Sequence, residues 1–189
     1  PTLTTTPEST SNPTTTEAQQ QATTPARTHE PKPTAVSTPE IVEGLSVEAA
    51  DTLKRLINLK RQELGLPQLN PNPGLQKAAE DYVTFLFPLW PGNEDIDPHN
   101  ARGTYQSRAE ETGYIGVVKE NLARPIVDPK LFTGGEYALW IWMWSPPHRD
   151  NMLDPNWREI GVACYRQLRY DALFVLCAAE FGTPSNSSQ

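Results

Sequence analysis

The sequence predicts an α+β fold, a three-layer α-β-α sandwich with a small antiparallel sheet, preceded by a disordered Thr/Pro-rich tail. Three observations lead to this prediction. Residues 1–45 are rich in Thr, Pro, Ser and Gln and carry few large apolar side chains, so they cannot bury enough surface to fold. Several later segments place apolar residues at helical spacing. Two β-type runs, 159–167 and 172–181, are separated by a short turn, which is typical of a hairpin.

These composition changes divide the 189-residue chain into three parts. Residues 1–45 are predicted to be a linker or stalk, 46–182 a single domain and 183–189 a flexible C-terminal tail. The Thr/Pro-rich part suits O-glycosylation and an extended spacer, and equally an unmodified disordered tail. Because the chain begins with Pro1, we expect that a signal or anchor segment preceded it.

The first half of the domain is predicted to form three helices. Ser46 can cap a helix over 47–65, whose leucines recur at helical spacing and whose end is marked by Gly65. After a turn-rich loop, a second amphipathic helix is expected over 75–87. A third, shorter helix is expected over 104–113.

The apolar segment 131–147 is ambiguous from periodicity alone. Its tryptophans alternate as on a strand, but such a dense apolar run also suits a helix that is buried all round. Its ends decide between the two. Thr133 and Glu136 form a capping-box pattern and a proline pair stops the run, so we expect a helix over 134–144 and a further helical turn over 148–153.

The two cysteines lie in the two strands of the predicted hairpin. If the strands pair around Tyr170 and Asp171, the side chains of Cys164 and Cys177 fall opposite each other on one face. A disulfide there closes a short loop, which stabilises the fold by about 3 kcal/mol on the chain-entropy model. The alternative is a pair of buried free thiols acting as small apolar side chains.

Charge and hydropathy exclude two classes of partner. The formal net charge is −7, and no basic stripe or block is present, which argues against nucleic acid and against docking to anionic lipid. No apolar run approaches the ~18 residues of a membrane span. We therefore expect no nucleic-acid partner and no membrane span in this chain.

The segment from Ser145 onward is the first candidate site. Ser145 is placed as an N-cap with Pro146 in the first helical position, which puts His148 and Arg149 in the first turn. The free N–H groups there would attract an anion and lower the pKa of His148. The alternative is structural: His148 bonds a loop carbonyl, Arg149 pairs with a surface acid and Asn151 satisfies the turn.

Glu120 and Asn121 are the second candidate pair. An acid and an amide in a locally apolar stretch must be hydrogen-bonded or paired if they are buried. The alternative is that Glu120 is a surface carboxylate beside Lys119.

Taken together, several blocks resemble a known family. In order and spacing, "LINLKRQELGLPQLNPNPGLQKAAEDY", "GTYQSRAEETGY", "KENLA" and "WMWSPPHRDNMLDPNWREIGVACY" are similar to the CAP or SCP domain family, which includes cysteine-rich secretory proteins, antigen 5 and pathogenesis-related proteins. The likeness is greatest to its bacterial branch and extends from about Leu53 to Gly182. It implies a three-layer α-β-α sandwich in an extracellular, cell-surface or periplasmic protein.

The resemblance also implies a cleft lined by two histidines and one or two acids, which in several members holds zinc or another divalent ion. Glu120 matches the family acid and His148 the second histidine. The first histidine is replaced in register by Pro98, with His99 one residue later. Ser145 stands where many members have a second acid. His99, Glu120 and His148 are thus the candidate ligands of zinc or another divalent ion. We expect that the domain does not require such a cofactor for its function.

We expect a binding or assembly module with a polar His/Glu cleft, tethered by a flexible tail. Its partner would be a small apolar ligand, a glycan or a surface-assembly protein. Aromatic side chains, those of Tyr105, Tyr114, Trp142 and Trp144, would surround the cleft. The alternative is that these aromatic residues belong to the core, as is usual at helical spacing. The candidate cleft residues are Glu120, Asn121, Trp142, Ser145, His148, Arg149 and Asn151.

The alternative function is a metal-assisted or Ser/His/Glu hydrolase, a peptidase or an esterase, that uses the same cleft. Glu120 would be the general base, His148 an acid or metal ligand and Ser145 the nucleophile. Helix capping argues against this role, because a capping Ser145 hydroxyl would face backbone donors and not the imidazole.

Overall fold

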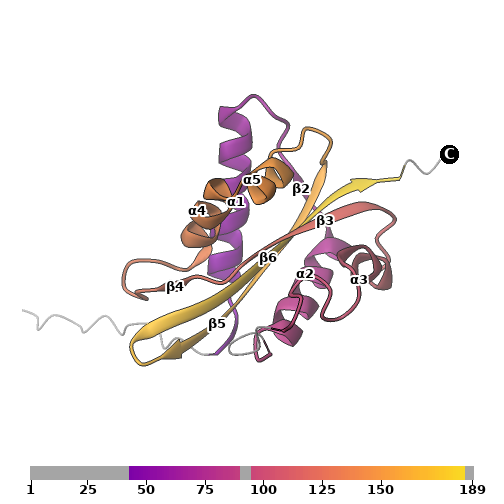
Figure 1. Ribbon diagram of the computed structural model, residues 1–189. Coiled ribbons are helices and arrows are strands. Elements are labelled where there is room, and N and C mark those ends of the chain that lie inside the picture. Colours follow the sequence, from indigo (N-terminus) through magenta and orange to yellow (C-terminus); the bar gives the residue numbers. More distant parts are fainter. Residues whose placement is uncertain (1–42, 90–94, 186–189) are drawn as a thin grey trace, which may run out of the picture. The chain divides into compact units, whose positions relative to one another are not determined.

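A computed structural model describes residues 43–89 and 95–185 of the chain (Figure 1). The predicted linker therefore lies almost wholly outside the described residues. The domain extends beyond both predicted boundaries, 46 and 182. At its start a short strand already pairs at Gly44, and at its end the last strand continues to Pro184.

A six-stranded, mostly antiparallel sheet forms the centre of the domain. Its main order is β1-β5-β6-β3, with β2 added to β5 in parallel and β4 added to β6. The strands are β1 (Gly44–Leu45), β2 (Asn70–Pro71), β3 (Gly116–Ala123), β4 (Ile126–Val127), β5 (Glu159–Arg169) and β6 (Ala172–Pro184). Only the β5–β6 hairpin was expected from the sequence.

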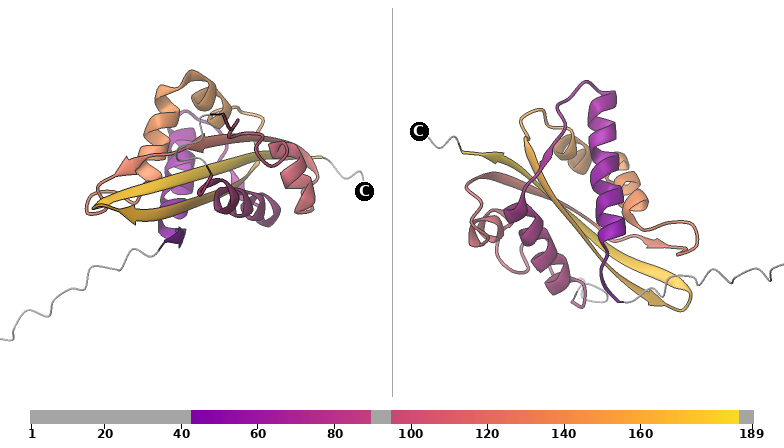
Figure 2. Two further views of the ribbon diagram at one scale, coloured as in Figure 1. Left: turned by 60° about the horizontal axis from the view of Figure 1, so that its bottom comes forward. Right: turned by 180° about the vertical axis from the view of Figure 1, so that it is seen from behind.

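Helices cover both faces of this sheet. Helices α1, α4 and α5 lie on one face, and α2 and α3 lie on the other (Figure 2). The helices are α1 (Val47–Glu63), α2 (Pro73–Leu86), α3 (Tyr105–Glu111), α4 (Gly135–Trp144) and α5 (Pro146–Met152). The predicted three-layer α-β-α sandwich is confirmed.

The central strand β6 supplies side chains to a hydrophobic core on each face. Val175 and Cys177 pack with α1 and α4, whereas Leu176 and Ala178 pack with α2. This alternation follows from the two-residue period of a strand. The helices approach closely: a Cβ on Gly161 of β5 would lie 2.1–2.3 Å from the backbone of α2, so only glycine fits there.

The helix starts follow the predicted signals, with differences of one or two residues. Ser46 caps α1 by accepting a hydrogen bond from the Ala49 N–H. Helix α2 begins two residues earlier than predicted, because Asn72 caps it. At α4, the Glu136 carboxylate accepts hydrogen bonds from the N–H and the hydroxyl of Thr133, at 3.1 and 2.8 Å. The capping residue of α4 is nevertheless Gly134.

The terminal hairpin turns at Tyr170 and Asp171, as predicted. Both residues have positive φ, 50° and 65°, which a two-residue turn between right-twisted strands requires. Cys164 and Cys177 are directly opposite in the β5–β6 register and form a disulfide. The predicted disulfide is thereby confirmed, and it lies on the α1 side of the sheet.

Candidate functional site

A polar cleft of about 260 Å³ opens at β3, the edge strand of the sheet. Its walls come from three segments of the sequence: the loop before α3 together with the first residue of that helix, strand β3, and helix α5. The lining residues are His99, Tyr105, Lys119, Glu120, Asn121, Pro147, His148 and Asn151. Glu120 and His148, the central pair of the sequence-based hypothesis, thus lie in one cleft.

Glu120 and Asn121 reach opposite faces of the sheet because they are neighbours on one strand. The Glu120 carboxylate turns toward α3, where its Oε2 accepts a hydrogen bond from Arg108 Nη2 at 2.5 Å. The Asn121 carboxamide turns toward α5, where its Nδ2 donates to the carbonyl of His148 at 2.8 Å. The pair therefore ties both helical layers to the edge strand that carries the cleft.

Arg108 holds the buried floor of the cleft, and the sequence did not single it out. Its guanidinium is almost fully buried, donates to Glu120 and lies 3.4 Å from the ring centroid of Tyr82. It also donates to the carbonyls of His99 and Gly103, at 3.0 and 2.7 Å. One side chain thus fixes both the carboxylate and the loop before α3.

Glu180 is a second buried acid behind this floor. It lies opposite Glu120 in the β3–β6 register, and its Oε1 is 3.8 Å from Arg108 Nη2. Burial, followed by the neighbouring Glu120, raises the pKa of Glu180 well above its ordinary value. Two carboxyl groups therefore face one guanidinium, which favours a proton on Glu180.

His99 is held at the mouth of the cleft by its own loop. Asp97 accepts hydrogen bonds from the N–H of His99 and from the side chain of Asn100, at 2.9 and 2.7 Å. The His99 ring then meets the carboxylate, with 2.9 Å between its Nδ1 and Glu120 Oε1. The loop places His99 in the cleft even though Pro98 occupies the family position.

His148 faces Ser145, which corrects a prediction. Ser145 is the N-cap residue of α5, but its side chain makes no capping hydrogen bond. Its hydroxyl instead lies 2.8 Å from His148 Nδ1. Burial, and then the neighbouring His99, lower the pKa of His148, in the predicted direction. The imidazole is therefore neutral near pH 7, and its ring centroid is 6.5 Å from that of His99.

Helix α5 is fixed to β3 through a pair of amides. Asn151 Nδ2 donates to Asn121 Oδ1 at 2.8 Å, while Asn121 bonds the His148 carbonyl. The carbonyl of Asn151 in turn accepts from the indole N–H of Trp157. These contacts hold His148 over the cleft.

Comparison with known proteins agrees with this architecture. The model of the cysteine-rich secretory protein family, CAP, matches residues 54–178. The chain belongs to this family. No curated protein matches the sequence.

Solved structures similar to this CAP domain include two bacterial proteins. An outer surface protein of Borrelia burgdorferi has a TM-score of 0.58 and 22% identity, covering 76% of this chain and 100% of that one. An extracellular protein of Bacillus anthracis that contains an SCP domain has a TM-score of 0.54 and 20% identity, covering 71% of this chain and 40% of that one. At these identities the likeness establishes the fold alone.

Three predicted cleft residues of the CAP domain lie outside the cleft: Trp142, Arg149 and Ser145, whose hydroxyl contacts His148. Trp142 is fully buried in the core, where its indole N–H donates to the Leu122 carbonyl at 2.9 Å. The Arg149 guanidinium pairs with Asp150 at the surface, as the structural alternative expected. Of the four aromatic residues expected around the cleft, only Tyr105 lines it.

The predicted metal ligands do not form a ligand set. Within 43–89 and 95–185, no three His, Cys, Asp or Glu side chains are grouped so that they could hold an ion. Both oxygens of Glu120 are occupied, one by Arg108 and one by His99. The arrangement therefore fits hydrogen bonding by the side chains themselves.

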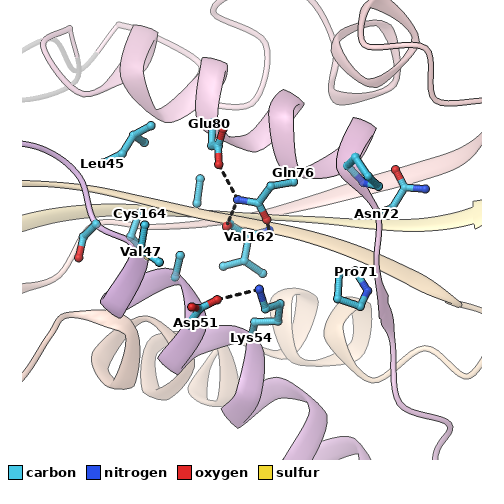
Figure 3. A pocket seen from close by; sticks show the side chains of 14 residues that line it. Leu45, Val47, Asp51, Lys54, Pro71, Asn72, Gln76, Glu80, Val162 and Cys164 are labelled. Atoms are coloured by element: carbon cyan, nitrogen blue, oxygen red, sulfur yellow. Dashed lines mark hydrogen bonds and ion pairs between the residues drawn. The ribbon is translucent and has the colours of Figure 1, made fainter.

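A larger cavity of about 420 Å³ lies between α1, α2 and the outer edge of β5 (Figure 3). There the Gln76 carboxamide bonds both the N–H and the carbonyl of Val162, in place of a neighbouring strand. Its charged groups are also paired, since Asp51 bonds Lys54 at 2.8 Å. In the β3 cleft, by contrast, Lys119 and the second ring nitrogens of His99 and His148 make no hydrogen bond within the described residues, so this smaller cleft is the better candidate site.

Proposed function

We propose that this CAP domain is an extracytoplasmic binding module whose cleft at β3 holds a small hydroxylated ligand, such as one sugar unit of a glycan. The observation that carries the proposal is the lining of the cleft. Imidazole, carboxamide and ammonium groups come from His99, His148, Asn151 and Lys119. A sugar hydroxyl both donates and accepts hydrogen bonds, so it suits such a mixed set.

The apolar part of the lining supports the same ligand class. Tyr105 and Pro147 offer flat apolar surfaces beside the polar groups. Sites for small ligands commonly combine apolar walls with a few placed polar groups. The buried pairing of Arg108 with Glu120 keeps the floor rigid, which reduces the entropy lost on binding.

One observation favours a hydrolase instead, namely the 2.8 Å contact between Ser145 Oγ and His148 Nδ1. Two features argue against that function. Ser145 does not line the cleft, so a substrate there would not reach its hydroxyl. Glu120 pairs with His99 and not with His148, so no acid orients the imidazole for proton transfer. We therefore assign Ser145 the role of holding the His148 ring.

The test is calorimetric titration of the protein with tri-N-acetylglucosamine and with cellotriose. We expect binding of at least one, and a loss of about tenfold or more in affinity for His148→Ala, which removes a ring from the cleft wall. Asp51→Ala, in the larger cavity, is the matched control and should bind normally. Absence of binding to both sugars, or equal weakening by both substitutions, would contradict the proposal.

Ser145→Ala separates the two functions. If the cleft only binds, this variant keeps most of its affinity, and the wild type hydrolyses p-nitrophenyl acetate no faster than the variant. If hydrolysis occurs and disappears with Ser145→Ala, the hydrolase is the correct assignment.

A further inference from the structure

Helix α4 and the residues just before it carry a row of aromatic rings, which we call the aromatic stripe: the exposed Tyr137, Trp140 and Trp144 on the helix, and the half-buried Phe132 before it. Successive ring centroids are 5.0, 6.0 and 6.2 Å apart. Three of the rings share one helix face because their spacings are three and four residues. Trp140 and Trp144 are 58% and 74% exposed, and Leu131, next to Phe132 in the chain, is 69% exposed.

The domain covers only one side of this helix. Ala138 and Trp142 are fully buried, and Gly135 packs against the backbone of α1 near Ala49. A helix that is apolar all round is normally buried all round. In α4 the outer half stays in water, so the stripe has no partner within the described part of the chain.

The chemistry of the stripe fits a lipid surface better than a sugar. Glu136 is the only charged residue of α4, and its carboxylate is occupied by Thr133. The stripe therefore lacks the carboxylate and amide groups that sugar hydroxyls require. What remains are Trp and Tyr rings, each with an apolar body and a single polar tip, and these side chains concentrate at membrane interfaces.

The area of the stripe fits a lipid surface better than a protein. At 37%, 58% and 74% exposure, Tyr137, Trp140 and Trp144 present roughly 250–420 Å², given ~150–250 Å² per aromatic side chain. A stable protein interface buries about 800 Å² on each partner. A bilayer needs no complementary shape and takes up rings of this kind individually.

We propose that the aromatic stripe docks the domain on the surface of a bilayer of neutral, zwitterionic lipid. The rings lie among the headgroups, and the chain remains a peripheral protein through this contact. No helix in 43–89 or 95–185 is long and apolar enough to cross a bilayer. The net charge of −7 opposes anionic headgroups, which selects the neutral lipid. This inference is independent of the ligand in the cleft.

The test is flotation of the full chain with phosphatidylcholine vesicles. We expect the wild type to float and the double variant W140A/W144A to lose about tenfold or more of its partition coefficient. The matched control is I115A/V117A, which removes two exposed apolar side chains, 74% and 60% exposed, at the start of β3. This control should float like the wild type, and phosphatidylglycerol added at low salt should weaken binding.

Tryptophan quenching by brominated phosphatidylcholine provides a second measurement. Quenching should be strong in the wild type and largely lost in W140A/W144A, although that variant keeps the buried Trp142 and Trp157. Near-ultraviolet circular dichroism checks that the variant is folded. The proposal is overturned if the wild type does not float, or if the stripe variant and the control float equally. It is also overturned if the wild type forms a dimer, or is retained on a chitin matrix, and W140A/W144A does not.

Discussion

Replacing Arg108 by methionine tests the buried floor of the cleft most sharply. The side chains of Arg108 and Glu120 are 3% and 0% exposed and are joined at 2.5 Å. Methionine keeps much of the apolar contact with Tyr82 but leaves the carboxylate buried without its cation. Removing one partner of a buried ion pair costs about 3–5 kcal/mol, so we expect the free energy of unfolding to fall by that amount.

The control is Arg102→Met. Arg102 lies 3.6 Å from Glu111 in a pair whose side chains are 46% and 61% exposed. A surface pair of this kind contributes ~0–1 kcal/mol. Urea denaturation of both variants, with the disulfide intact, gives the comparison.

A double variant identifies the cause of the loss. In R108M/E120Q the buried charge is removed together with its partner, so part of the stability should return, with a coupling energy of at least ~1.5 kcal/mol. A loss of less than about 1 kcal/mol for Arg108→Met, or a loss no larger than that of Arg102→Met, would contradict the role of Arg108 as the cation of a buried pair.

Because the pKa of Glu180 is raised, the native state keeps a proton that the unfolded chain releases above about pH 4.3. The free energy of unfolding of the wild type, relative to that of Glu180→Gln, should therefore fall by up to ~1.4 kcal/mol per pH unit as pH rises from the unfolded to the native pKa. If urea denaturation gives the same difference between the two proteins at every pH in this range, the raised pKa is wrong. Because the pKa of His148 is lowered, its NMR titration midpoint should lie below the ordinary ~6.5. Its contribution to stability should be present above pH ~6.5 and should be lost as pH falls from there through the lower native midpoint. A midpoint above ~6.5 would count against the burial of the ring. Replacing Cys164 and Cys177 together by alanine should lower the free energy of unfolding, measured by urea denaturation, by about 3 kcal/mol. A loss under ~1 kcal/mol would show that the disulfide adds little to the stability of the paired strands.

The parts of the fold that the sequence predicted depend on local signals. Ser46 caps a helix, and a two-residue turn brings Cys164 and Cys177 into register, so both features can be read within a few residues. Strand β3 was missed because Lys119, Glu120 and Asn121 interrupt its apolar pattern. Those polar residues are tolerated on an edge strand that forms the wall of a cleft.

The candidate site was predicted in part, and the missing residues carry no local signal. Arg108 and Glu180 meet Glu120 only through the packing of α3 and the register of β3 with β6. Helical phase decided which tryptophans are buried: Trp142 faces the core, while its neighbours two residues away face water. Spacing separates Trp142 from Trp140 and Trp144 once the segment is a helix, but which of the two faces meets the core depends on how α4 packs on α1 and the sheet.

We propose that the cleft between β3 and α5 is the binding site of this CAP domain. The direct measurement is a two-dimensional ¹H–¹⁵N NMR titration of the full chain with tri-N-acetylglucosamine and with cellotriose. We expect the largest shifts at His99, Asn121, His148 and Asn151. Shifts concentrated around Gln76 and Val162 in the larger cavity, or no shifts with either sugar, would contradict it.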